Sequence, residues 1–360
     1  MQLPLLKDVS VRGKAVFLRA DLDVPLSQLA TIEDDTRLKS ALPTIEYLLK
    51  QNAKVIIGGH LGRPIGLNHE ARIMNHELSL RPVAEWFAKR FHDSQFMIHD
   101  SKLGKFEGWE IGPNIFLLEN LRFFEGEEKN DPEFGKKLAS LAEIYVNDAF
   151  AMCHRNHASI VGITKFLPHF AGFHLEQEVS HLTHAMENPK RPLVVIVGGK
   201  KIETKLPLVE KMHHISDYVL VGGKIAKEST DLVKVAHEKI SGKKAILLVA
   251  QLNEEGIDIT DTDAENFLQI ISLAKTIIWN GSMGIIGGKS EHLVSESGTR
   301  KIAEGILKTN AYTIVGGGDT VEFLNKMGIL SKFSFASTGG GAMLAFLSGE
   351  KLPGLEALKT

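Results

Sequence analysis

The sequence predicts an α/β protein of two domains, and three observations support this prediction. Its 360 residues are enough for two domains, and a hydrophobic content of 43% is enough to fill two cores. Short runs of β-branched and other apolar residues, such as LVVIV at 193–197, are typical of parallel strands that are covered on both faces. Many of the 33 glycines directly follow such runs, where a strand passes into a helix.

Composition limits the possible partners and compartments. The formal net charge is −2, so we expect no nucleic acid or membrane partner, and any basic site must be local. Cys153 is the single cysteine, which excludes a disulfide framework and fits a reducing compartment. The N-terminal stretch carries Lys7 and Asp8 where a signal peptide needs a longer apolar core, and no apolar run approaches the roughly 20 residues of a membrane span. We therefore expect a cytoplasmic globular protein.

Strands and helices alternate in the first half of the sequence. Strands are expected at residues 15–18, 55–57, 96–98, 115–118 and 145–146. An amphipathic helix is expected to begin at Arg37, and another spans residues 83–91. Charged and polar side chains follow most of these strands: Asp21, Asp23, His60, Arg63, Arg122, Arg155 and His157.

This arrangement predicts an anion-binding site. Ligands of open α/β sheets bind outside the carboxyl ends of the strands. Arginine binds phosphate and carboxylate through paired, charge-assisted hydrogen bonds. One arginine after a strand is more often a surface ion-pair partner. Four of them, Arg37, Arg63, Arg122 and Arg155, in a slightly negative chain instead indicate a small, highly anionic ligand.

A helix is expected between the two halves. Residues 173–186 have helical apolar spacing, and Asn188, Pro189 and Pro192 end the segment. We interpret it as a linker helix, with domain boundaries near Gly172 and Asn188.

The second half opens with the strand at 193–197, which Gly198 and Gly199 turn into a helix. Lys200, Lys201 and Lys205 are expected in the first turns of that helix, with Lys201 and Lys205 on one face. Cations are disfavoured at a helix N-terminus, so their presence indicates an anion in front of them. A solvated lysine run is the alternative for this stretch taken alone.

Further strands are expected at 218–221, 245–249, 276–279, 312–315 and 334–336, and all but the second lead into glycine clusters. Backbone N–H groups at such turns bind phosphates. Asp319 follows one cluster, where it could hold a magnesium ion through its carboxylate or act as a helix N-cap.

Other patterns do not fit their motifs. GIIGGKS at 284–290 is one residue short of a P-loop, and GGGDTV lacks the dinucleotide fingerprint. His181 and His184 have no further zinc ligands beside them in the sequence, and a satisfied or solvent-facing pair is expected. Cys153 is expected to be an inert neighbour of His154.

With these motifs in their order, the sequence resembles the phosphoglycerate kinase family. The resemblance runs almost end to end through RADLDVP, GGHLGRP, LLENLRF, YVNDAF with HRNHAS, GGKKIETK, WNGSMG, GGGDT, and STGGGA followed by LPGLEAL. It implies two Rossmann-like domains, each a parallel sheet flanked by helices, joined by an interdomain helix and a hinge. It also implies reversible phosphoryl transfer between 1,3-bisphosphoglycerate and Mg-ADP, giving 3-phosphoglycerate and ATP, by a monomer.

The resemblance divides the chain into a phosphoglycerate-binding domain at 1–172, an interdomain helix at 173–187, a nucleotide-binding domain at 188–344, and a tail at 345–360 that returns to the first domain. It places Asp21, Asp23, Arg37, His60, Arg63, Arg122 and Arg155 on the phosphoglycerate side, with Arg37 reaching the transferred group. Lys201 and Lys205 would join Arg37 as catalytic residues. The nucleotide and its Mg²⁺ would contact these lysines and a further set of residues: Asn280, Glu291, Gly316, Gly317, Gly318, Asp319, Thr320, Gly339, Gly340 and Gly341.

The sequence also departs from the family pattern. Asp23 stands where the family has asparagine, Thr204 where it has aspartate, and Lys224 where it has glycine. The segment between Gly223 and Trp279 is shorter than in the family by a few tens of residues. The ribose-binding glutamate of the family falls on Gly287 when counted forward from WNG and on Glu291 when counted backward from Gly298.

These departures leave two alternatives beside an active phosphoglycerate kinase. One is a catalytically silent relative that binds phosphoglycerate or a protein partner, which the altered glycine loops suggest. The other is a kinase that uses a different nucleotide, which the shortened segment suggests. Calorimetric titration with Mg-ADP and a panel of nucleoside diphosphates distinguish them.

Overall fold

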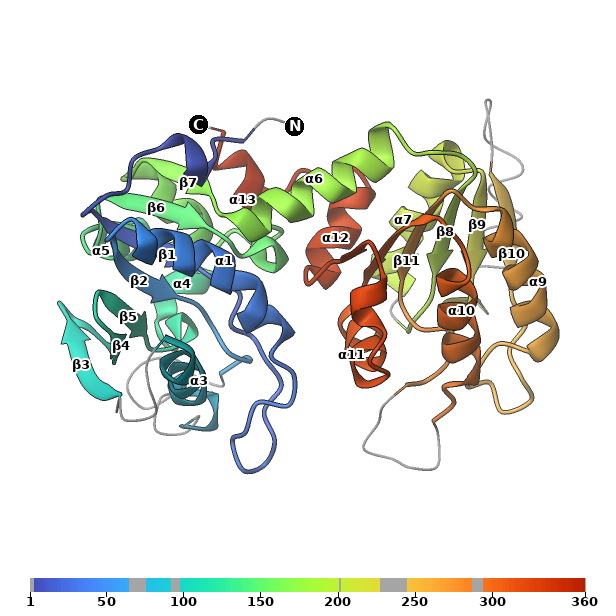
Figure 1. The fold of residues 1–360 in the computed structure, drawn as a ribbon, viewed down its shortest axis with the longest axis horizontal. Coiled ribbons are helices and arrows are strands. Elements are labelled where there is room, and N and C mark those ends of the chain that lie inside the picture. Colours follow the sequence, from blue (N-terminus) through green and yellow to red (C-terminus); the bar gives the residue numbers. More distant parts are fainter. Residues whose placement is uncertain are drawn as a thin grey trace. The chain divides into compact units, whose positions relative to one another are not determined.

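A computed structural model describes residues 3–64, 76–91, 98–200, 202–226, 245–286 and 294–359. The chain forms two compact units, shown in Figure 1. The first comprises Met1–Gln177 together with Leu352–Thr360, and the second comprises Glu178–Lys351. Each unit is built on a sheet that is mainly or wholly parallel and is flanked by helices, which confirms the predicted fold class.

The first unit contains a seven-stranded sheet in the order β3-β4-β5-β2-β1-β6-β7. Its strands are β1 (Ala15–Arg19), β2 (Lys54–Gly58), β3 (His99–Leu103), β4 (Phe106–Gly112), β5 (Ile115–Leu118), β6 (Ile144–Asn147) and β7 (His169–Ala171). β1, β2, β5, β6 and β7 run parallel. The first four were expected from their apolar runs, whereas the short strand β7 was not predicted. β4 pairs antiparallel with both β3 and β5.

The hairpin of β3 and β4 corrects the prediction for this region. The expected strand at 96–98 lies mostly outside the described residues, and β3 begins at His99. β3 reads HDSKL and has no buried residue, so it carries no apolar pattern from which a strand could be predicted. β4 alternates buried Phe106, Gly108 and Trp109 with more exposed positions only imperfectly.

The helices of the first unit are α1 (Thr36–Lys50), α3 (Arg81–Phe91), α4 (Glu125–Glu128), α5 (Pro132–Ala139) and the start of α6 (Phe173–Glu187). Short helical turns also occur, among them η3 (Leu121–Phe123), η4 (Phe150–Met152) and the π-helical η5 (Ala158–Gly162). The apolar faces of α1 and α3 share one buried core with alternate residues of β1, β2 and β6.

The second unit contains a six-stranded sheet in the order β10-β9-β8-β11-β12-β13, and every pairing is parallel. Its strands are β8 (Leu193–Val197), β9 (Tyr218–Val221), β10 (Ile246–Val249), β11 (Thr276–Asn280), β12 (Tyr312–Gly316) and β13 (Phe335–Ala336). Every residue of β8 and β11 is buried, as the continuous apolar runs predicted for strands covered on both faces.

Helices α9 (Asp261–Leu273), α10 (Ser297–Leu307) and α11 (Gly318–Lys326) contribute to one core with β8, β11 and β12. Helix α7 (Ile202–Ile215) packs on β8 and β9, and α12 (Gly340–Leu347) packs on α7. The start of α9 is fixed locally, since the Thr260 hydroxyl accepts a hydrogen bond from the Asp263 backbone N–H. Among the described helices, none combines the length and the apolar character needed to cross a membrane.

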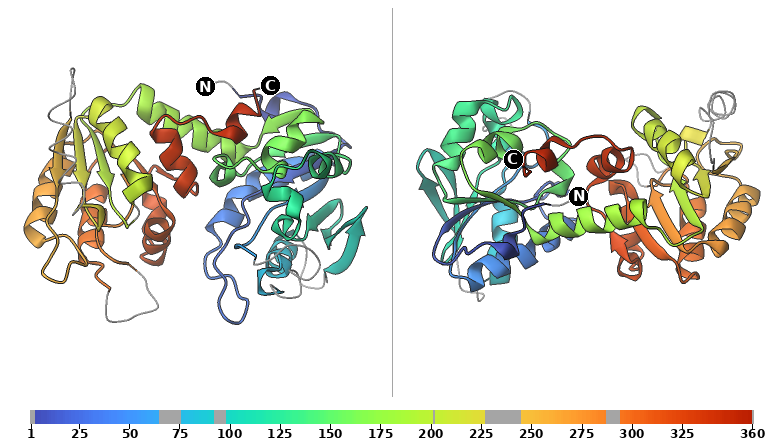
Figure 2. Two further views of the ribbon diagram at one scale, coloured as in Figure 1. Left: turned by 180° about the vertical axis from the view of Figure 1, so that it is seen from behind. Right: turned by 90° about the horizontal axis from the view of Figure 1, so that it is seen from above.

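The chain passes from one unit to the other twice. The boundary between the units falls inside α6, after Gln177, and not at its start near Gly172. The returning segment begins at Leu352 and not at 345, because α12 packs on α7 of the second unit. The segment ends in α13 (Pro353–Glu356), which contacts η5 among the elements of the first unit (Figure 2).

Candidate active site

The charged residues predicted to bind an anion lie beyond the strand ends of the first unit. The parallel strands β5, β2, β1 and β6 are neighbours in the sheet, so their carboxyl ends meet at one edge. Asp21 and Asp23 follow β1, and His60 and Arg63 follow β2. Arg122 lies in η3 after β5, and Arg155 follows η4 after β6.

Arg37 connects the start of α1 to the loop that follows β1. Its Nε lies 3.3 Å from Oδ2 of Asp21, and its Nη1 donates to the main-chain oxygen of Asp23. The Asp23 carboxylate is 3.6 Å from the same Nη1. Burial raises the pKa of Asp21, and the Arg37 charge opposes this rise. Two carboxylates, those of Asp21 and Asp23, thus lie beside the Arg37 guanidinium, and 28% of the Arg37 side chain remains exposed.

His60 and Arg122 are joined through the loop after β2. Gly62 donates its N–H to Oδ1 of Asp23 at 2.8 Å, and its carbonyl accepts from Nη1 of Arg122 at 2.6 Å. His60 lies with Nε2 3.7 Å from Oδ2 of Asp23. Burial lowers the pKa of Arg122, the charges of Glu128 and Asp23 oppose this shift, and the charges of Arg19 and Arg63 add to it.

Arg155 affects the histidines beside it through its charge. Burial lowers the pKa of His157 to about 3, and the charges of Arg19, Arg122 and Arg155 act in the same direction. His157 therefore experiences the positive potential of the arginines around it. Hydrogen bonds and polar contacts connect five of the seven residues predicted for the phosphoglycerate side: Asp21, Asp23, Arg37, His60 and, through Gly62, Arg122. Among the described residues Arg63 and Arg155 have no such contact with these five, and only their charges act on Arg122 and His157.

Three buried residues behind this cluster were not predicted to take part in the site. They are Arg19, Glu127 and Ser159, each with 0% exposure. Arg19 ends the apolar strand β1, and a charged residue at a buried strand position was the one available signal. Ser159 is the last residue of HRNHAS, but the motif did not indicate its role, and Glu127 belongs to no motif. Only the tertiary structure brings α4 and η5 beside β1.

In the second unit, the strand ends of β8 and β11 meet around Lys205. The Lys205 ammonium donates to the main-chain oxygen of Asn280 at 3.1 Å and also to the Asn280 side-chain oxygen. Gly281 has φ +100°, and a Cβ there would lie 2.1 Å from the Gly198 oxygen. Glycine is therefore required at Gly281, because the two loops approach each other backbone to backbone.

Lys205 is buried, with 8% exposure, although it carries the charge expected to bind phosphate. Burial lowers its pKa to about 7, and the charge of Asp319 opposes this shift. Asp319 is exposed at the start of α11. The structure thus brings Lys205, Asn280 and Asp319 together, while Lys200 precedes α7, which begins at Ile202 and not earlier as predicted.

The predicted glycine clusters lie where β12 and β13 pass into helices. Gly316 ends β12, Gly317 has φ +96°, and Gly318 begins α11. Gly339 precedes α12, which starts with Gly340 and Gly341. A Cβ at Gly318 or at Gly340 would meet no atom within 4 Å, so the backbone is open to a ligand at both helix starts.

Comparison with known proteins identifies the family. The sequence profile described as phosphoglycerate kinase matches residues 6–230 and 229–350. The chain belongs to the phosphoglycerate kinase family. It is 36% identical to phosphoglycerate kinase 3, cytosolic, of Arabidopsis thaliana, and 37% identical to the phosphoglycerate kinase of Dictyoglomus turgidum. These alignments cover 98% of this chain and 97% and 98% of the relatives.

Solved structures of the family are similar as well. The phosphoglycerate kinase from Coxiella burnetii matches with a TM-score of 0.78 and 31% identity, covering 99% of both chains. That from Pyrococcus horikoshii matches with a TM-score of 0.73 and 29% identity, covering 99% of this chain and 98% of the other. The Arabidopsis alignment spans 397 positions against 360 residues here, so that phosphoglycerate kinase carries residues that this chain lacks. The profile match breaks at 229–230, between Gly223 and Trp279.

The described residues of the second unit fit a magnesium ion that is bound together with a nucleotide. Mg²⁺ is usually held by one or two carboxylates plus substrate phosphates and waters. Asp319 offers one exposed carboxylate beside Lys205. The described residues contain no group of three or more His, Cys, Asp or Glu that would form an all-protein metal site. The donor set therefore suits a metal that arrives with phosphate ligands.

Some predicted residues lie outside the described part of the chain. Lys201 and both positions considered for the ribose-binding glutamate, Gly287 and Glu291, fall there. His181, by contrast, is described. Its ring stacks on Phe335 at 4.2 Å between centroids, and its Nδ1 bonds to the Tyr312 hydroxyl. This histidine is therefore a packing residue of the second unit, as expected.

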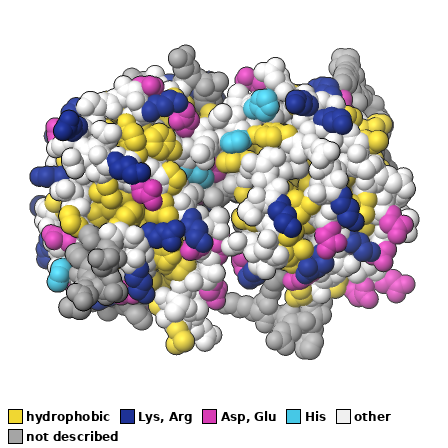
Figure 3. All heavy atoms as spheres, in the orientation of Figure 1, with side chains coloured by type: hydrophobic (Ala, Val, Ile, Leu, Met, Phe, Trp, Pro, Cys, Tyr) yellow, Lys and Arg dark blue, Asp and Glu magenta, His cyan; other side chains and the backbone are white. Residues whose placement is uncertain are grey.

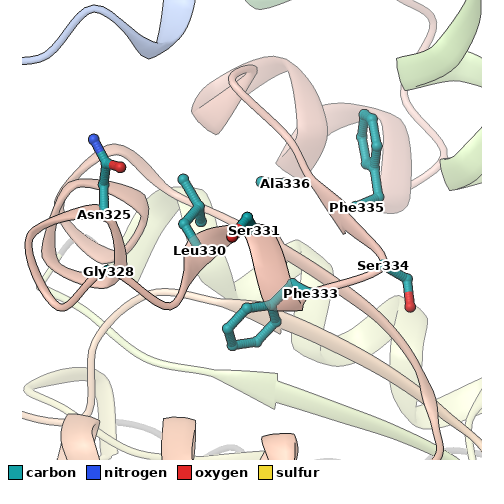
Figure 4. A pocket seen from close by; sticks show the side chains of 8 residues that line it. All are labelled: Asn325, Gly328, Leu330, Ser331, Phe333, Ser334, Phe335 and Ala336. Atoms are coloured by element: carbon teal, nitrogen blue, oxygen red, sulfur yellow. The ribbon is translucent and has the colours of Figure 1, made fainter.

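A pocket of about 410 Å³ lies apart from the predicted site residues of this kinase (Figure 4). Phe333 and Phe335 point to opposite sides of the chain in Figure 4, and Phe333 belongs to the core of the second unit. None of the predicted site residues is among those that line the pocket: Asn325, Gly328, Leu330, Ser331, Phe333, Ser334, Phe335 and Ala336.

Proposed function

We propose that this chain catalyses reversible phosphoryl transfer between 1,3-bisphosphoglycerate and Mg-ADP, giving 3-phosphoglycerate and ATP. Membership of the family makes it a phosphotransferase with a carboxyl group as acceptor. The single observation that carries the assignment of substrate is the cluster of basic residues at adjacent strand ends of the first unit, in a chain with a net charge of −2. On the face drawn in Figure 3, basic and acidic side chains of the described residues are interspersed, so the attraction for anions must be local.

The first unit is proposed to bind phosphoglycerate. Arg63, Arg122 and Arg155 bind its phosphate and carboxylate, since guanidinium groups pair with both through two hydrogen bonds. Arg37 reaches the transferred group. Asp21 and Asp23 orient the Arg37 guanidinium, as their distances of 3.3 and 3.6 Å support.

The second unit is proposed to bind the nucleotide. The backbone N–H groups at Gly316–Thr320 and Gly339–Gly341 hold phosphate oxygens at the starts of α11 and α12. Lys205, with Lys201, neutralises charge on the transferred group, and Asn280 orients Lys205. Glu291 is proposed to bind the ribose. Mg²⁺, held through Asp319, would neutralise charge on the phosphate oxygens.

The chemistry requires alignment more than proton transfer. The acceptor is a carboxylate that is already ionised, so no general base is needed. Catalysis then depends on placing the two reactants in line and on neutralising the three equatorial oxygens. We propose that a hinge motion brings the two bound substrates together and excludes water, which would otherwise hydrolyse the acyl phosphate.

A coupled assay with 3-phosphoglycerate, ATP and magnesium tests the proposal. Arg37→Ala should lower kcat by about 10²–10³-fold, which corresponds to about 3–4 kcal/mol of transition-state stabilisation. Lys39→Ala is the matched control, because Lys39 is exposed on the same helix and, within the described part of the chain, forms an ion pair with Asp35 alone. Near-native turnover of Arg37→Ala would refute its role. No turnover of 3-phosphoglycerate by the unmodified protein with any nucleoside triphosphate would refute the proposed activity.

The proposal extends to nucleotide preference, assembly and compartment. ADP is the expected acceptor nucleotide, and ATP is the expected donor in the direction assayed. Because the chain is shortened near the region expected to bind the base, the same assay with other nucleoside triphosphates in place of ATP tests this expectation. We propose a monomer in the cytoplasm. Sedimentation velocity would detect a larger assembly.

A further inference from the structure

A buried chain of hydrogen bonds ends at His60 in the proposed phosphoglycerate site. It runs from Glu127 in α4 through Ser159 in η5 and Arg19 at the end of β1. The exposed fractions of Glu127, Ser159 and Arg19 are 0%, and that of His60 is 2%. Buried hydrogen bonds of charged groups are strong and fix geometry. The four residues come from four separate segments, so only the tertiary fold assembles the chain.

The first link fixes the direction of the Ser159 hydroxyl. Oε2 of Glu127 accepts from the Ser159 backbone N–H at 3.0 Å, and Oε1 accepts from the Ser159 hydroxyl at 2.5 Å. Because the hydroxyl has one proton and gives it to Glu127, its oxygen is left as an acceptor. Nε of Arg19 donates to that oxygen at 2.9 Å. The carboxylate therefore orients the guanidinium through the serine.

The last link determines which nitrogen of His60 carries a proton. Nη2 of Arg19 lies 3.1 Å from Nδ1 of His60. A guanidinium has donors only, so Nδ1 must be the acceptor and cannot carry a proton. The remaining nitrogen, Nε2, then carries the ring proton. Among the described residues Nε2 has no hydrogen-bond partner, and the nearest carboxylate oxygen, Oδ2 of Asp23, is 3.7 Å away.

We propose that Glu127, Ser159 and Arg19 hold His60 as the neutral Nε2–H tautomer, so that this N–H is a fixed donor to the anionic substrate. Glu127 and Ser159 are positioning residues, since they act through Arg19. The role toward substrate rests on the proposed function, whereas the tautomer itself does not.

The charges around His60 favour the same state. Arg19 from β1, Arg37 from α1, Arg122 from η3 and His157 before η5 all lower its pKa, in addition to the larger effect of burial. Asp23 is the negative group that faces it, at 3.7 Å. His60 therefore stays neutral through the physiological range and donates to the substrate without exchanging a proton with water when the substrate binds.

The alternative tautomer would weaken binding. With the proton on Nδ1, the His60 donor would oppose the Arg19 guanidinium, and the Nε2 lone pair would face the substrate anion. A site that presents a lone pair to an anion in place of a donor loses a hydrogen bond and gains repulsion. Relaxing the tautomer should therefore raise KM for 3-phosphoglycerate about tenfold, with a smaller effect on kcat.

Nitrogen-15 NMR of the histidine rings in the full-length protein tests the assignment directly. His60→Gln serves only to identify the signal among the 15 histidines. We expect the unprotonated nitrogen of His60 to be Nδ1, without titration between pH 6 and 8. An Nδ1–H tautomer, or a protonated ring at pH 7, would overturn the proposal, whether or not the protein is an active kinase.

Two variants test the positioning roles. Ser159→Ala removes the link, and Glu127→Gln removes its charge at constant size. Both should give a mixture of His60 tautomers and the rise in KM. Thr164→Val is the matched control, because it removes a buried hydroxyl of the same unit whose one hydrogen bond to a described residue is to the Val161 carbonyl. An unchanged His60 signal in folded Ser159→Ala and Glu127→Gln would overturn the positioning role.

The two levels of the proposal fail separately. If 3-phosphoglycerate leaves the His60 signal of the native protein unchanged while the signal shows the Nε2–H tautomer, the proposed substrate is wrong and the tautomer assignment stands. If both variants fail to fold, the native spectrum still decides the tautomer.

Discussion

Lys205 should make the stability of the second unit and its binding of nucleotide depend on pH above 7. Its pKa is about 7 in the folded protein, against an ordinary value of 10.5. The unfolded chain therefore binds more protons than the folded chain between these values, and stability rises with pH across that window. The full shift corresponds to about 5 kcal/mol, and the part between pH 7 and pH 9 to about 2 kcal/mol.

The measurement compares the native protein with Lys205→Met, which keeps the length of the side chain and removes the charge. Urea unfolding at pH 7 and pH 9 can be followed by fluorescence of Trp279, which is buried in β11 beside Asn280. Trp86 and Trp109 lie in the first unit and are replaced by phenylalanine in both proteins. We expect the unfolding free energy of the protein with Lys205, relative to that of Lys205→Met, to rise by about 2 kcal/mol between pH 7 and pH 9.

Binding provides an independent test of the same pKa. Near pH 8 the free protein holds about 0.1 proton on Lys205, and a bound phosphate should restore the charged form. Calorimetry of Mg-ADP binding in buffers with different ionisation enthalpies should then show uptake of close to one proton, about 0.9. Binding without proton uptake, together with an unfolding difference independent of pH, would refute the reasoning.

Three further predictions concern stability and packing. Burial raises the pKa of Asp148 to about 6 from 3.8, so the first unit should lose about 2 kcal/mol of stability as the pH rises from about 4 to 6. Asp148→Asn should abolish this loss in pH-dependent urea unfolding. Gly281→Ala should lower the free energy of unfolding by more than about 3 kcal/mol, because the new Cβ clashes with the backbone. Gly256 has φ +69° and no atom within 4 Å of an added Cβ, so Gly256→Ala should lower it by about 1 kcal/mol. Equal losses for the two variants in chemical denaturation would contradict this prediction. In Gly354→Ala the new Cβ would lie 2.9 Å from Cα of Cys153, so the C-terminal segment should pack less closely on the first unit. The buried Cys153 thiol should then react about tenfold faster with a disulfide reagent. Labelling at the native rate would show that the segment accommodates the added methyl group.

The sequence predicted the parallel strands well because they are apolar on both faces. The predicted strand at 193–197 matches β8, and the other parallel strands that were predicted differ from the observed ranges by no more than one residue at each end. The three-residue parallel strand β7 was not predicted. The hairpin of β3 and β4 was missed, since β3 is polar and exposed and its pairing depends on contacts distant from its own residues. Boundaries set by packing, such as the one inside α6, were also displaced.

Candidate site residues could be predicted where a charged side chain directly follows an apolar strand. Asp23, His60 and Arg122 were proposed in this way, and the structure shows contacts that connect them through the loop after β2. Glu127 could not be proposed, because a buried counter-charge has no local sequence pattern, and Ser159 lies in HRNHAS without a role that the motif indicates. The low pKa of Lys205 likewise results from burial of its side chain beside the loop after β11. The residues next to Lys205 in the sequence do not indicate this burial.

The return of Leu352–Thr360 to the first unit has a consequence for synthesis on the ribosome. The N-terminal part of this unit leaves the exit tunnel long before its last helix has been translated. Until termination, the surface of Ile160 and Cys153 that Gly354 covers in the finished protein stays open. The unit made first is therefore completed last, and a nascent chain stalled before Leu352 would expose a docking surface that chaperones could bind.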